Sequence, residues 1–316
     1  MERRNRRQEI ERRLAPRRLI EAEHHKGRRA HGRGDFLLRH DAVVRPLVRL
    51  GLQALGLYGR GLGNALRPVV RAFRLDFPNL PPAFEGFRIL HLSDLHLDGV
   101  DGLAEAAASL LAGISADLCV LTGDYRYEVA GPCEEVYRRL EIVLSAVRAR
   151  SGIRAVLGNH DGADMAAELE ARDVRMLLNE SAVIERDGEA IWVAGVDDPH
   201  YYGCDDLPEA LREVPPGAFT VLLAHSPEMY EEADRAKIAL YLCGHTHAGQ
   251  VHLPGVGAPL VNARCPREYT SGAWRHGAVR GVTSAGVGCS LLPVRYLCPP
   301  EIVVIELSKT APGALE

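Results

Sequence analysis

Five apolar runs of strand length each end in side chains that can bind a metal ion, and this pattern constrains the fold more than any other feature. The runs read "FRILHLSD", "DLCVLTGD", "GIRAVLGNHD", "FTVLLAHSP" and "IALYLCGHTH". The polar residues at or just after their ends are Asp94, His96, Asp124, Asn159, His160, Asp161, His225, His245 and His247. Turns alone explain one or two such endings, so five in one chain indicate a shared site.

Helix-like segments separate the first three runs. Amphipathic spacing predicts helices from Leu103, from Glu134 and over residues 163–172. Strands that alternate with helices predict an α/β fold. After Arg172 the apolar segments are strand-like with little room for helices, so we expect two sheets stacked face to face with helices outside.

The ends of the five runs are expected to converge, because open α/β sheets bind ligands just beyond the carboxyl ends of their strands. Nitrogen and oxygen donors without thiolate suit Mn, Fe, Zn or Mg. The donors exceed what one small ion needs and fit two. Two ions about 3.5–4 Å apart clamp phosphoryl oxygens and turn a bridging water into hydroxide, which favours hydrolysis at phosphorus.

The ordered motifs resemble those of the calcineurin-like metallophosphoesterases. That family carries DxH, GD, GNH(D/E), a later His and GHxH, which stand here at residues 94–96, 123–124, 158–161, 225 and 244–247. The resemblance spans residues 87–307 and implies a four-layer α/β/β/α sandwich, in agreement with the strand pattern. It also implies a metal-dependent hydrolase of phosphoric esters or pyrophosphates.

The resemblance implies two groups of metal ligands that share one bridging carboxylate, Asp124. The ligands of one ion would be Asp94, His96 and His247. The ligands of the other would be Asn159, His225 and His245. The expected cofactors are two divalent ions, with Mn first and Fe, Zn or Mg as alternatives.

His160 is the expected catalytic residue. In such families this histidine binds no metal but faces the phosphate, where it stabilises the transition state or protonates the leaving oxygen. Asp161 has two readings, since it either orients His160 or caps the helix that follows. Arg126, just after the bridging Asp124, either binds a second phosphate through its guanidinium fork or is a surface ion-pair partner.

Within the family, the segments "HLSDLHL", "GHTHAGQV" and "GVGCSLLPVRYLCPPEIVVIEL" are most similar to a bacterial, membrane-associated branch. This branch includes proteins that resemble UDP-2,3-diacylglucosamine pyrophosphatase. The resemblance therefore implies a phosphate-containing substrate, with a lipid-linked one among the candidates. A basic amphipathic stretch stands here where members of the branch often carry an N-terminal membrane anchor.

Charge divides the chain near residue 80. Residues 1–80 contain 19 Lys and Arg against 8 Asp and Glu, while the whole chain contains 38 against 42. We expect a basic, flexible or loosely helical arm over residues 1–44, an amphipathic helical segment with a linker over residues 45–80, and the catalytic domain over residues 81–316. A basic arm on an acidic body suggests an anionic partner.

Residues 45–74 place polar residues, four of them arginines, at helical spacing opposite a face of leucines. One reading is an interfacial helix on an anionic membrane surface. The other is a helix packed on the body or on a second subunit. No secretory signal or spanning segment is recognised, and the 7 cysteines form no disulfide framework. The expected location is therefore cytoplasmic, including peripheral contact with the inner face of the cytoplasmic membrane.

Three functions remain open at this point. The first is hydrolysis of a phosphodiester, phosphomonoester or pyrophosphate bond by a metal-bridging hydroxide, on a substrate such as UDP-2,3-diacylglucosamine. The second is a nuclease or cyclic-nucleotide phosphodiesterase whose basic arm contacts nucleic acid. The third is a scaffold that retains the metal site without catalysis. The leucine face favours the first, and the intact His160 argues against the third.

Overall fold

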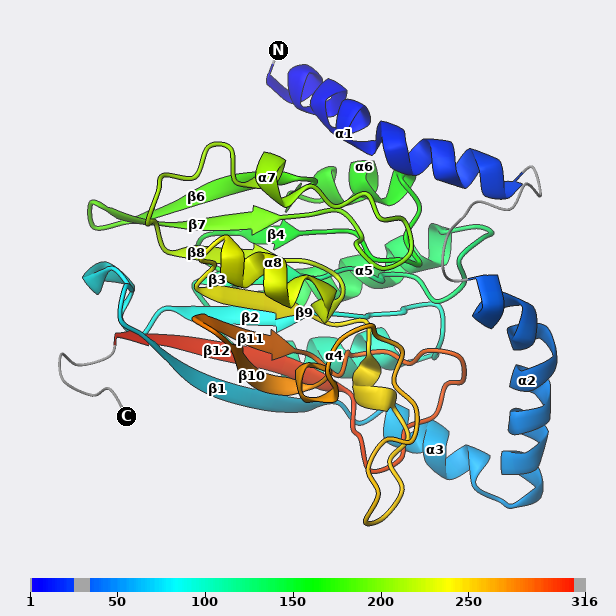
Figure 1. The fold of residues 1–316 in the computed structure, drawn as a ribbon. Coiled ribbons are helices and arrows are strands. Elements are labelled where there is room, and N and C mark those ends of the chain that lie inside the picture. Colours follow the sequence, from blue (N-terminus) through cyan, green and yellow to red (C-terminus); the bar gives the residue numbers. More distant parts are fainter. Residues whose placement is uncertain (1, 26–34, 310–316) are drawn as a thin grey trace.

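Two six-stranded sheets stack face to face, with helices on both outer faces (Figure 1). The computed structural model describes residues 2–25 and 35–309, and the side chains of residues 5–23 and 45–309. The expected four-layer α/β/β/α arrangement is confirmed. Within the described part of the chain, no helix is both long enough and apolar enough to cross a membrane.

The strands of each sheet follow one another in space in an order that differs from their order in the chain. The first sheet contains, in spatial order, β1 (Val69–Phe77), β12 (Glu301–Lys309), β2 (Arg88–Leu92), β3 (Leu118–Leu121), β4 (Ile153–Ala155) and β5 (Val174–Met176). The second contains β10 (Gly272–His276), β11 (Val279–Thr283), β9 (Leu240–Cys243), β8 (Thr220–Leu223), β7 (Glu189–Gly195) and β6 (Glu180–Arg186).

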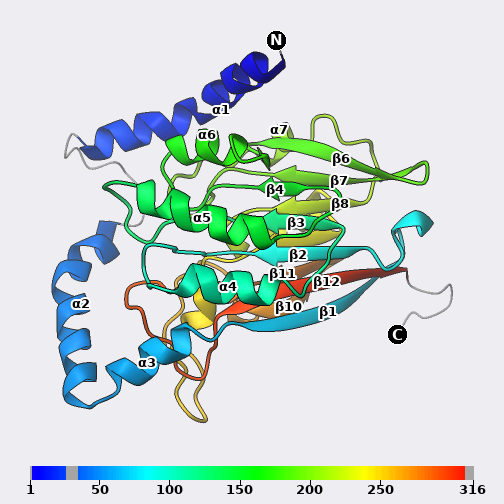
Figure 2. The ribbon, with the colours of Figure 1, turned by 180° about the vertical axis from the view of Figure 1, so that it is seen from behind.

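Three helices cover the outer face of the first sheet, as seen from behind in Figure 2. They are α4 (Leu103–Leu111), α5 (Glu134–Ala146) and α6 (Asp164–Glu170). Two short helices cover the second sheet, α7 (Leu207–Ala210) and α8 (Tyr230–Arg235). The helices predicted from Leu103, from Glu134 and over residues 163–172 therefore form where their amphipathic spacing places them.

The predicted apolar runs are the central strands of the two sheets. All four residues of β3, of β8 and of β9 are buried, because each of these strands has a packed layer on both faces. Side chains such as Val120, Val221 and Leu242 meet between the sheets in one apolar core. Strands β2 to β5 are parallel to one another, as are β7, β8, β9 and β11, so within each group the carboxyl ends lie together.

The boundary expected at residue 81 lies after the first strand of the domain. Strand β1 pairs in parallel with β12 from Val69 to Phe77, so the sheet includes residues that the sequence assigned to the amphipathic segment. That segment divides into the end of α2 (Asp35–Ala54), then α3 (Tyr58–Ala65), then β1. Gly56 adopts a φ of 67° where α2 ends, a conformation that favours glycine.

Of the two alternatives expected for the arm, flexible or loosely helical, residues 2–25 adopt the helical one, as a helix, α1, that packs on the body. Ile10 and Leu14 are buried in the core of the first sheet and its helices. Arg17 is fully buried as well. The basic composition did not predict these contacts, because it does not show that arginines such as Arg6, Arg13 and Arg17 bind acidic groups and carbonyls of the same chain. Residues 26–34 of the expected arm lie outside the described residues.

Candidate metal centre

The predicted metal ligands converge where the strands end. Three overlapping groups hold their ligand atoms within 4.8 Å of one another. The groups are Asp94, His96 and His247; His96, Asp124 and His160; and Asp124, His225 and His245. They come from the loops after β2, β3, β4, β8 and β9, so both sheets contribute to one site.

The loops that carry these side chains have an unusual backbone. The φ angles are 51° at Asp94, 41° at His96, 57° at Asp124, 68° at His245 and 48° at His247. Left-handed conformations at non-glycine residues cost on the order of 1–3 kcal/mol each and persist only where the surroundings hold them. These turns end the strands sharply, and they direct the polar side chains that follow each strand into the site.

Two motif glycines allow these loops to approach one another. A Cβ atom on Gly158 would collide with the carboxylate of Asp124, and one on Gly244 would collide with Ser93 and Asp94. Glycine is therefore required before Asn159 and before His245 because no side chain fits, which explains the GNHD and GHTH motifs physically.

His96 and His247 form the first side of the centre. The Nδ1–H of His96 donates to the carbonyl of Arg126 at 2.7 Å. Because a carbonyl only accepts, Nε2 of the neutral ring carries the lone pair, and it lies 3.2 Å from Nε2 of His247. The same His247 atom lies 3.4 Å from Asp94 Oδ1.

Asn159, His225 and His245 form the second side. The Nδ1–H of His225 donates to the carbonyl of Thr122 at 2.7 Å, which directs Nε2 into the site. Asn159 Oδ1 lies 2.9 Å from His225 Nε2 and 2.8 Å from His245 Nδ1. These two ring nitrogens are 3.2 Å apart.

Asp124 lies between the two sides. Its Oδ2 is 3.6 Å from His96 Nε2 and 3.3 Å from His225 Nε2. Its Oδ1 accepts a hydrogen bond from the backbone N–H of His160 at 2.8 Å. Asp124 therefore lies close to a ring nitrogen of each expected ligand group.

The charges of the site match divalent cations. Burial lowers the pKa of His96 to about 3 and raises the pKa of Asp94 to about 6. Burial also lowers the pKa of His225, but the nearby Asp124 outweighs it and raises that pKa to about 10. The raised pKa of His225 shows that the Asp124 carboxylate favours positive charge beside it, at a point where ring nitrogens and carboxylate oxygens face one another. Such nitrogen and oxygen donors fit small divalent metals.

His160 lies at the open edge of this cluster. Its side chain is 19% exposed, whereas those of His96 and His225 are fully buried. Its Nδ1–H donates to the carbonyl of Tyr127 at 2.6 Å, and Nε2 lies 3.9 Å from Asp124 Oδ2. His160 is therefore the one of these three rings that is partly open to solvent.

Asp161 performs neither of the two tasks expected from the sequence. Its buried carboxylate accepts hydrogen bonds from the backbone N–H groups of Asp124 at 2.8 Å, Tyr125 at 2.9 Å and Gly158 at 2.8 Å. It thereby joins the loop after β3 to the loop after β4. At the start of α6, the N–H of Ala163 instead donates a hydrogen bond to Glu21 of α1 at 2.8 Å.

Arg126 takes part in the site through its main chain, whose carbonyl orients His96. Its side chain is 5% exposed and donates to the carbonyl of Gly131 at 3.2 Å. It is therefore not an exposed ion-pair partner. Binding of a second phosphate by Arg126 stays a prediction.

Other residues of the site carried no recognised motif. The buried guanidinium of Arg295 has Nη2 at 3.1 Å from His247 Nδ1 and donates to the carbonyl of Ala285 at 2.7 Å. On the second side, the ring of His200 lies 4.1 Å from that of His245 and its Nδ1 is 2.8 Å from Glu228. A lone arginine or histidine far along the chain gives no pattern from which this proximity could be read.

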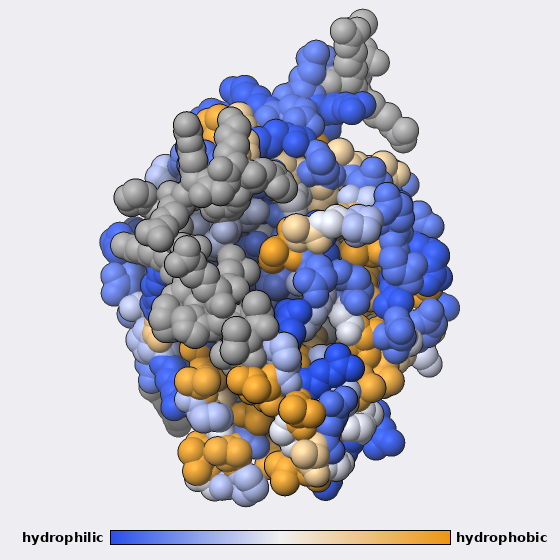
Figure 3. Space-filling view, turned by 90° about the vertical axis from the view of Figure 1, so that its right-hand side faces the viewer, coloured by the Kyte–Doolittle hydropathy of each residue, from blue (hydrophilic) through white to orange (hydrophobic). Residues whose placement is uncertain are grey.

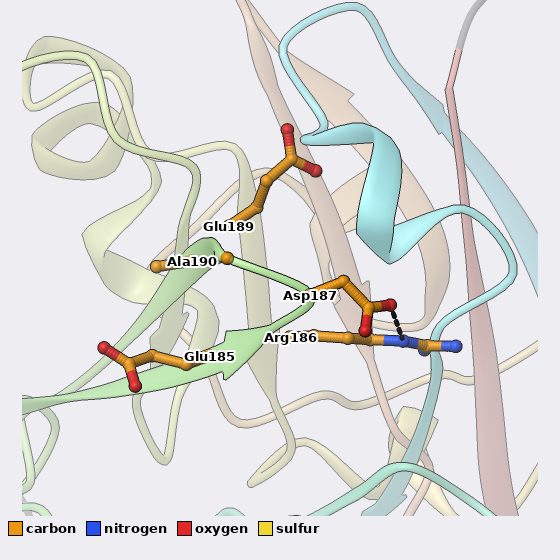
Figure 4. Close-up of a pocket in the computed structure, with 6 residues that line it drawn as sticks. Glu185, Arg186, Asp187, Glu189 and Ala190 are labelled. Atoms are coloured by element: carbon orange, nitrogen blue, oxygen red, sulfur yellow. Dashed lines mark ion pairs between the residues drawn. The ribbon is translucent and has the colours of Figure 1, made fainter.

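The hollow at the β6–β7 hairpin lies at the opposite end of the sheets (Figures 1 and 4). Its lining residues are 185–190, and three of its charged groups contact the protein itself. Arg186 lies 3.9 Å from Asp187 and 3.7 Å from Asp117, while Glu189 accepts a hydrogen bond from the N–H of Ala83 at 2.6 Å. Among the described residues, the groups suited to metal all lie at the other end.

The comparisons with known proteins agree with this geometry. Residues 87–249 match the model of the calcineurin-like phosphoesterase family. The chain is 29% identical over 242 residues to the uncharacterized metallophosphoesterase YkuE of Bacillus subtilis, covering 73% of this chain and 82% of that protein. It is 30% identical over 230 residues to the phosphodiesterase YaeI of Escherichia coli, covering 70% and 82%.

A third relative shares the domain within a larger protein. The transmembrane protein with metallophosphoesterase domain of Bos taurus is 34% identical over 224 residues, which is 64% of this chain and 50% of that protein. The matched family model covers the loops of Asp94, Asp124, Asn159, His225 and His245. The chain therefore belongs to the calcineurin-like phosphoesterase family and is a metal-dependent phosphoester hydrolase.

Proposed function

We propose that the protein hydrolyses a phosphodiester or pyrophosphate bond of an amphiphilic substrate, with two divalent ions held on the two sides of Asp124. The observation that carries the reaction type is the position of this carboxylate, 3.6 Å from a ring nitrogen of the first ligand group and 3.3 Å from one of the second. Mn is the first candidate, with Fe, Zn and Mg as alternatives.

The side chains divide the chemistry among them. Asp94, His96 and His247 would hold one ion, and Asn159, His225 and His245 the other. Two such ions bind phosphoryl oxygens and lower the pKa of water. The carbonyls of Arg126 and Thr122 bind Nδ1 of His96 and His225, so that Nε2 of each ring would face the ions and give up any proton when it binds one. His160, oriented by the carbonyl of Tyr127, would pass a proton to the leaving oxygen.

The substrate class rests on exposed apolar residues beside the site. We call them the apolar rim: Leu47, Val48, Leu50, Leu55, Leu57, Leu253, Val256, Leu260, Leu291 and Leu297. Figure 3 shows apolar side chains gathered on the lower part of the face that holds α2, α3 and the loops after β9. The hydroxyl of Tyr296 donates a hydrogen bond to the carbonyl of Leu57, and the carbonyl of Tyr296 accepts one from the N–H of His252. These two bonds join three of the segments that carry the rim.

Charge favours an anionic lipid surface as the occupant of this rim. Arg49, Arg60 and Arg67 are exposed on or next to the helices that carry the leucines. A basic residue near an anionic leaflet contributes about 1 kcal/mol, and buried apolar side chains add to that. Helix α3 itself packs on the body, since Asn64 donates to the carbonyl of Arg295 at 2.8 Å. The lipid-facing elements are then the end of α2 and the loops.

The reaction is tested with the metal-stripped protein, reloaded with Mn, Mg, Zn or Fe. The substrates are bis-p-nitrophenyl phosphate, nucleotides, cyclic nucleotides, short DNA and UDP-2,3-diacylglucosamine. Hydrolysis of the simple diester and of the lipid-linked pyrophosphate is the expected result. Preference for DNA or for a cyclic nucleotide would favour the nuclease or cyclic-nucleotide alternative, and no turnover with any metal would contradict the proposal.

The lipid surface is tested separately by co-sedimentation with vesicles of phosphatidylglycerol and phosphatidylcholine. A variant with Leu50→Gln, Val256→Gln and Leu260→Gln should lose binding, while Leu19→Gln, whose leucine is 69% exposed on α1 outside the rim, should retain it. Salt should release the parent protein only in part, because salt screens the arginines but not the leucines. Equal binding by all forms, or a dimer that the rim variant abolishes, would overturn the assignment.

A further inference from the structure

A fully buried arginine of the first helix reaches the back of the metal centre. The guanidinium of Arg17 pairs with Asp197, with Nη2 at 2.6 Å and Nε at 3.0 Å from Oδ1. Its remaining donors bind two carbonyls, that of Asp161 at 2.6 Å and that of Gly158 at 3.2 Å. The guanidinium also lies 3.8 Å from the centre of the Tyr202 ring.

The two carbonyls bound by Arg17 enclose the residues that matter most in this loop. Asn159 and His160 lie between them in the chain. The carboxylate of Asp161 fixes the inner side of the same loop through the N–H groups of Asp124 and Gly158. Arg17 thus holds from outside a loop that Asp161 holds from inside.

Docking of α1 does not by itself require this arrangement. Arg6 binds Glu180 at 2.7 Å and Glu170 at 2.9 Å, and Arg13 donates to the carbonyl of Asn179 at 2.6 Å. These contacts attach the helix without touching residues 158–161. Removing a guanidinium from water is costly unless every donor is used, and a planar fork uses several acceptors at once.

We infer that Arg17 is a positioning residue for the loop of Asn159 and His160, so that α1 completes the active site of its own chain. Lysine at this position could pair with Asp197, but a single ammonium lacks the fork that reaches both carbonyls as well. The inference rests on the proposed function only for its catalytic readout, since the order of the loop is measurable without turnover.

Arg17→Lys is the principal variant, because it keeps the charge beside Asp197. A second variant, Arg17→Met with Asp197→Asn, removes both charges together and avoids an unpaired buried carboxylate. The matched control is Arg6→Met, which removes an anchor of the same helix that does not touch the loop. Melting temperature is measured for all of them, to separate loss of fold from loss of position.

The first readout is amide hydrogen exchange of the peptide covering residues 156–163 in the metal-free protein. The second is kcat and KM for bis-p-nitrophenyl phosphate with metal restored. Both Arg17 variants should exchange faster in this peptide and lose about 10- to 100-fold in kcat at nearly constant KM, since small displacements of catalytic groups have effects of this size. Arg6→Met should lower only the melting temperature.

Wild-type exchange and wild-type kcat in Arg17→Lys would overturn the inference. So would equal losses in Arg6→Met, because the effect would then come from docking of α1 in general. If the parent protein hydrolyses none of the substrates, the proposed function fails, and the exchange comparison alone still decides whether Arg17 positions the loop.

Discussion

The carboxylate of Asp161 accepts a hydrogen bond from the backbone N–H of Asp124 at 2.8 Å, so the residue after His160 fixes the main chain of the carboxylate that we propose to bridge the two ions. The same carboxylate accepts from Tyr125 and Gly158. Two loops that carry ligands from neighbouring strands are therefore held in register by one side chain.

Replacing Asp161 by Asn should destabilise the protein and disorder the metal centre. The amide offers one oxygen and must direct its N–H₂ at a backbone donor, which leaves a buried N–H unpaired at a cost of about 1–3 kcal/mol. Chemical denaturation of the metal-free protein measures this loss. Exposed Asp101, changed to Asn, is the control, and equal midpoints for the two variants would contradict the role described for Asp161.

Asp124→Asn should lower metal content and abolish hydrolysis, because it removes the one charge available to both ligand groups. Metal content is measured by elemental analysis after dialysis against a fixed free-metal concentration. Wild-type melting of the metal-free variant would exclude simple unfolding. A variant that retains two ions per chain and normal turnover would show that Asp124 does not bridge.

His160→Ala should keep both metals and lose roughly 10²–10⁴-fold in kcat, the usual contribution of a positioned acid or base. The loss should be smaller for p-nitrophenyl esters, whose leaving group needs little protonation, than for alkyl phosphodiesters. Parallel loss of metal would instead make His160 a ligand, in line with its 3.9 Å distance from Asp124 Oδ2.

The metal-free protein should lose stability in acid, and His91 should account for part of the loss. Burial lowers the pKa of this histidine to about 3, and its Nε2 lies 2.8 Å from Thr122 Oγ1. Because the pKa of His91 is lower in the folded protein, the unfolded chain binds a proton at a higher pH than the folded protein does. The contribution is therefore complete above the unfolded pKa of about 6.5 and declines as pH falls toward 3, by about 1.4 kcal/mol per pH unit.

His91→Met removes this titration while filling the same buried space. Denaturation midpoints at pH 7, 5 and 4 should fall less steeply for the variant than for the parent. Parallel decline of the two proteins would assign the acid sensitivity to other groups.

The central strands and the convergence of the candidate ligands were predictable because each depends on a local pattern. Strand β9 is a buried apolar run, and GHTH follows it directly. The role of Asp161 was not predictable, since its acceptor geometry depends on three N–H groups from two loops. Arg17 was hidden for the same reason: it meets Asp197 at a separation of 180 residues, and nothing in a run of arginines marks one as buried.

The N-terminal boundary failed for a related physical reason. Residues 69–74 carry arginines at spacings that suit a helix as well as an exposed edge strand. Parallel pairing with β12 decides between them, and that partner lies far along the chain, at residues 301–309. The pairing of β1 with β12 in the folded protein, and not local secondary-structure propensity, determines that these residues form a strand.

The pairing of Val69 with Glu301 sets an order of events during synthesis. Strand β1 leaves the ribosome long before β12, which among the described residues is its only strand partner in the sheet. Until β12 emerges, an edge strand with free N–H and C=O groups is exposed to other nascent chains. A chain that terminates before residue 301 lacks β12 and leaves β1 without that pairing partner, so such termination should yield an aggregating product rather than a slightly shortened enzyme.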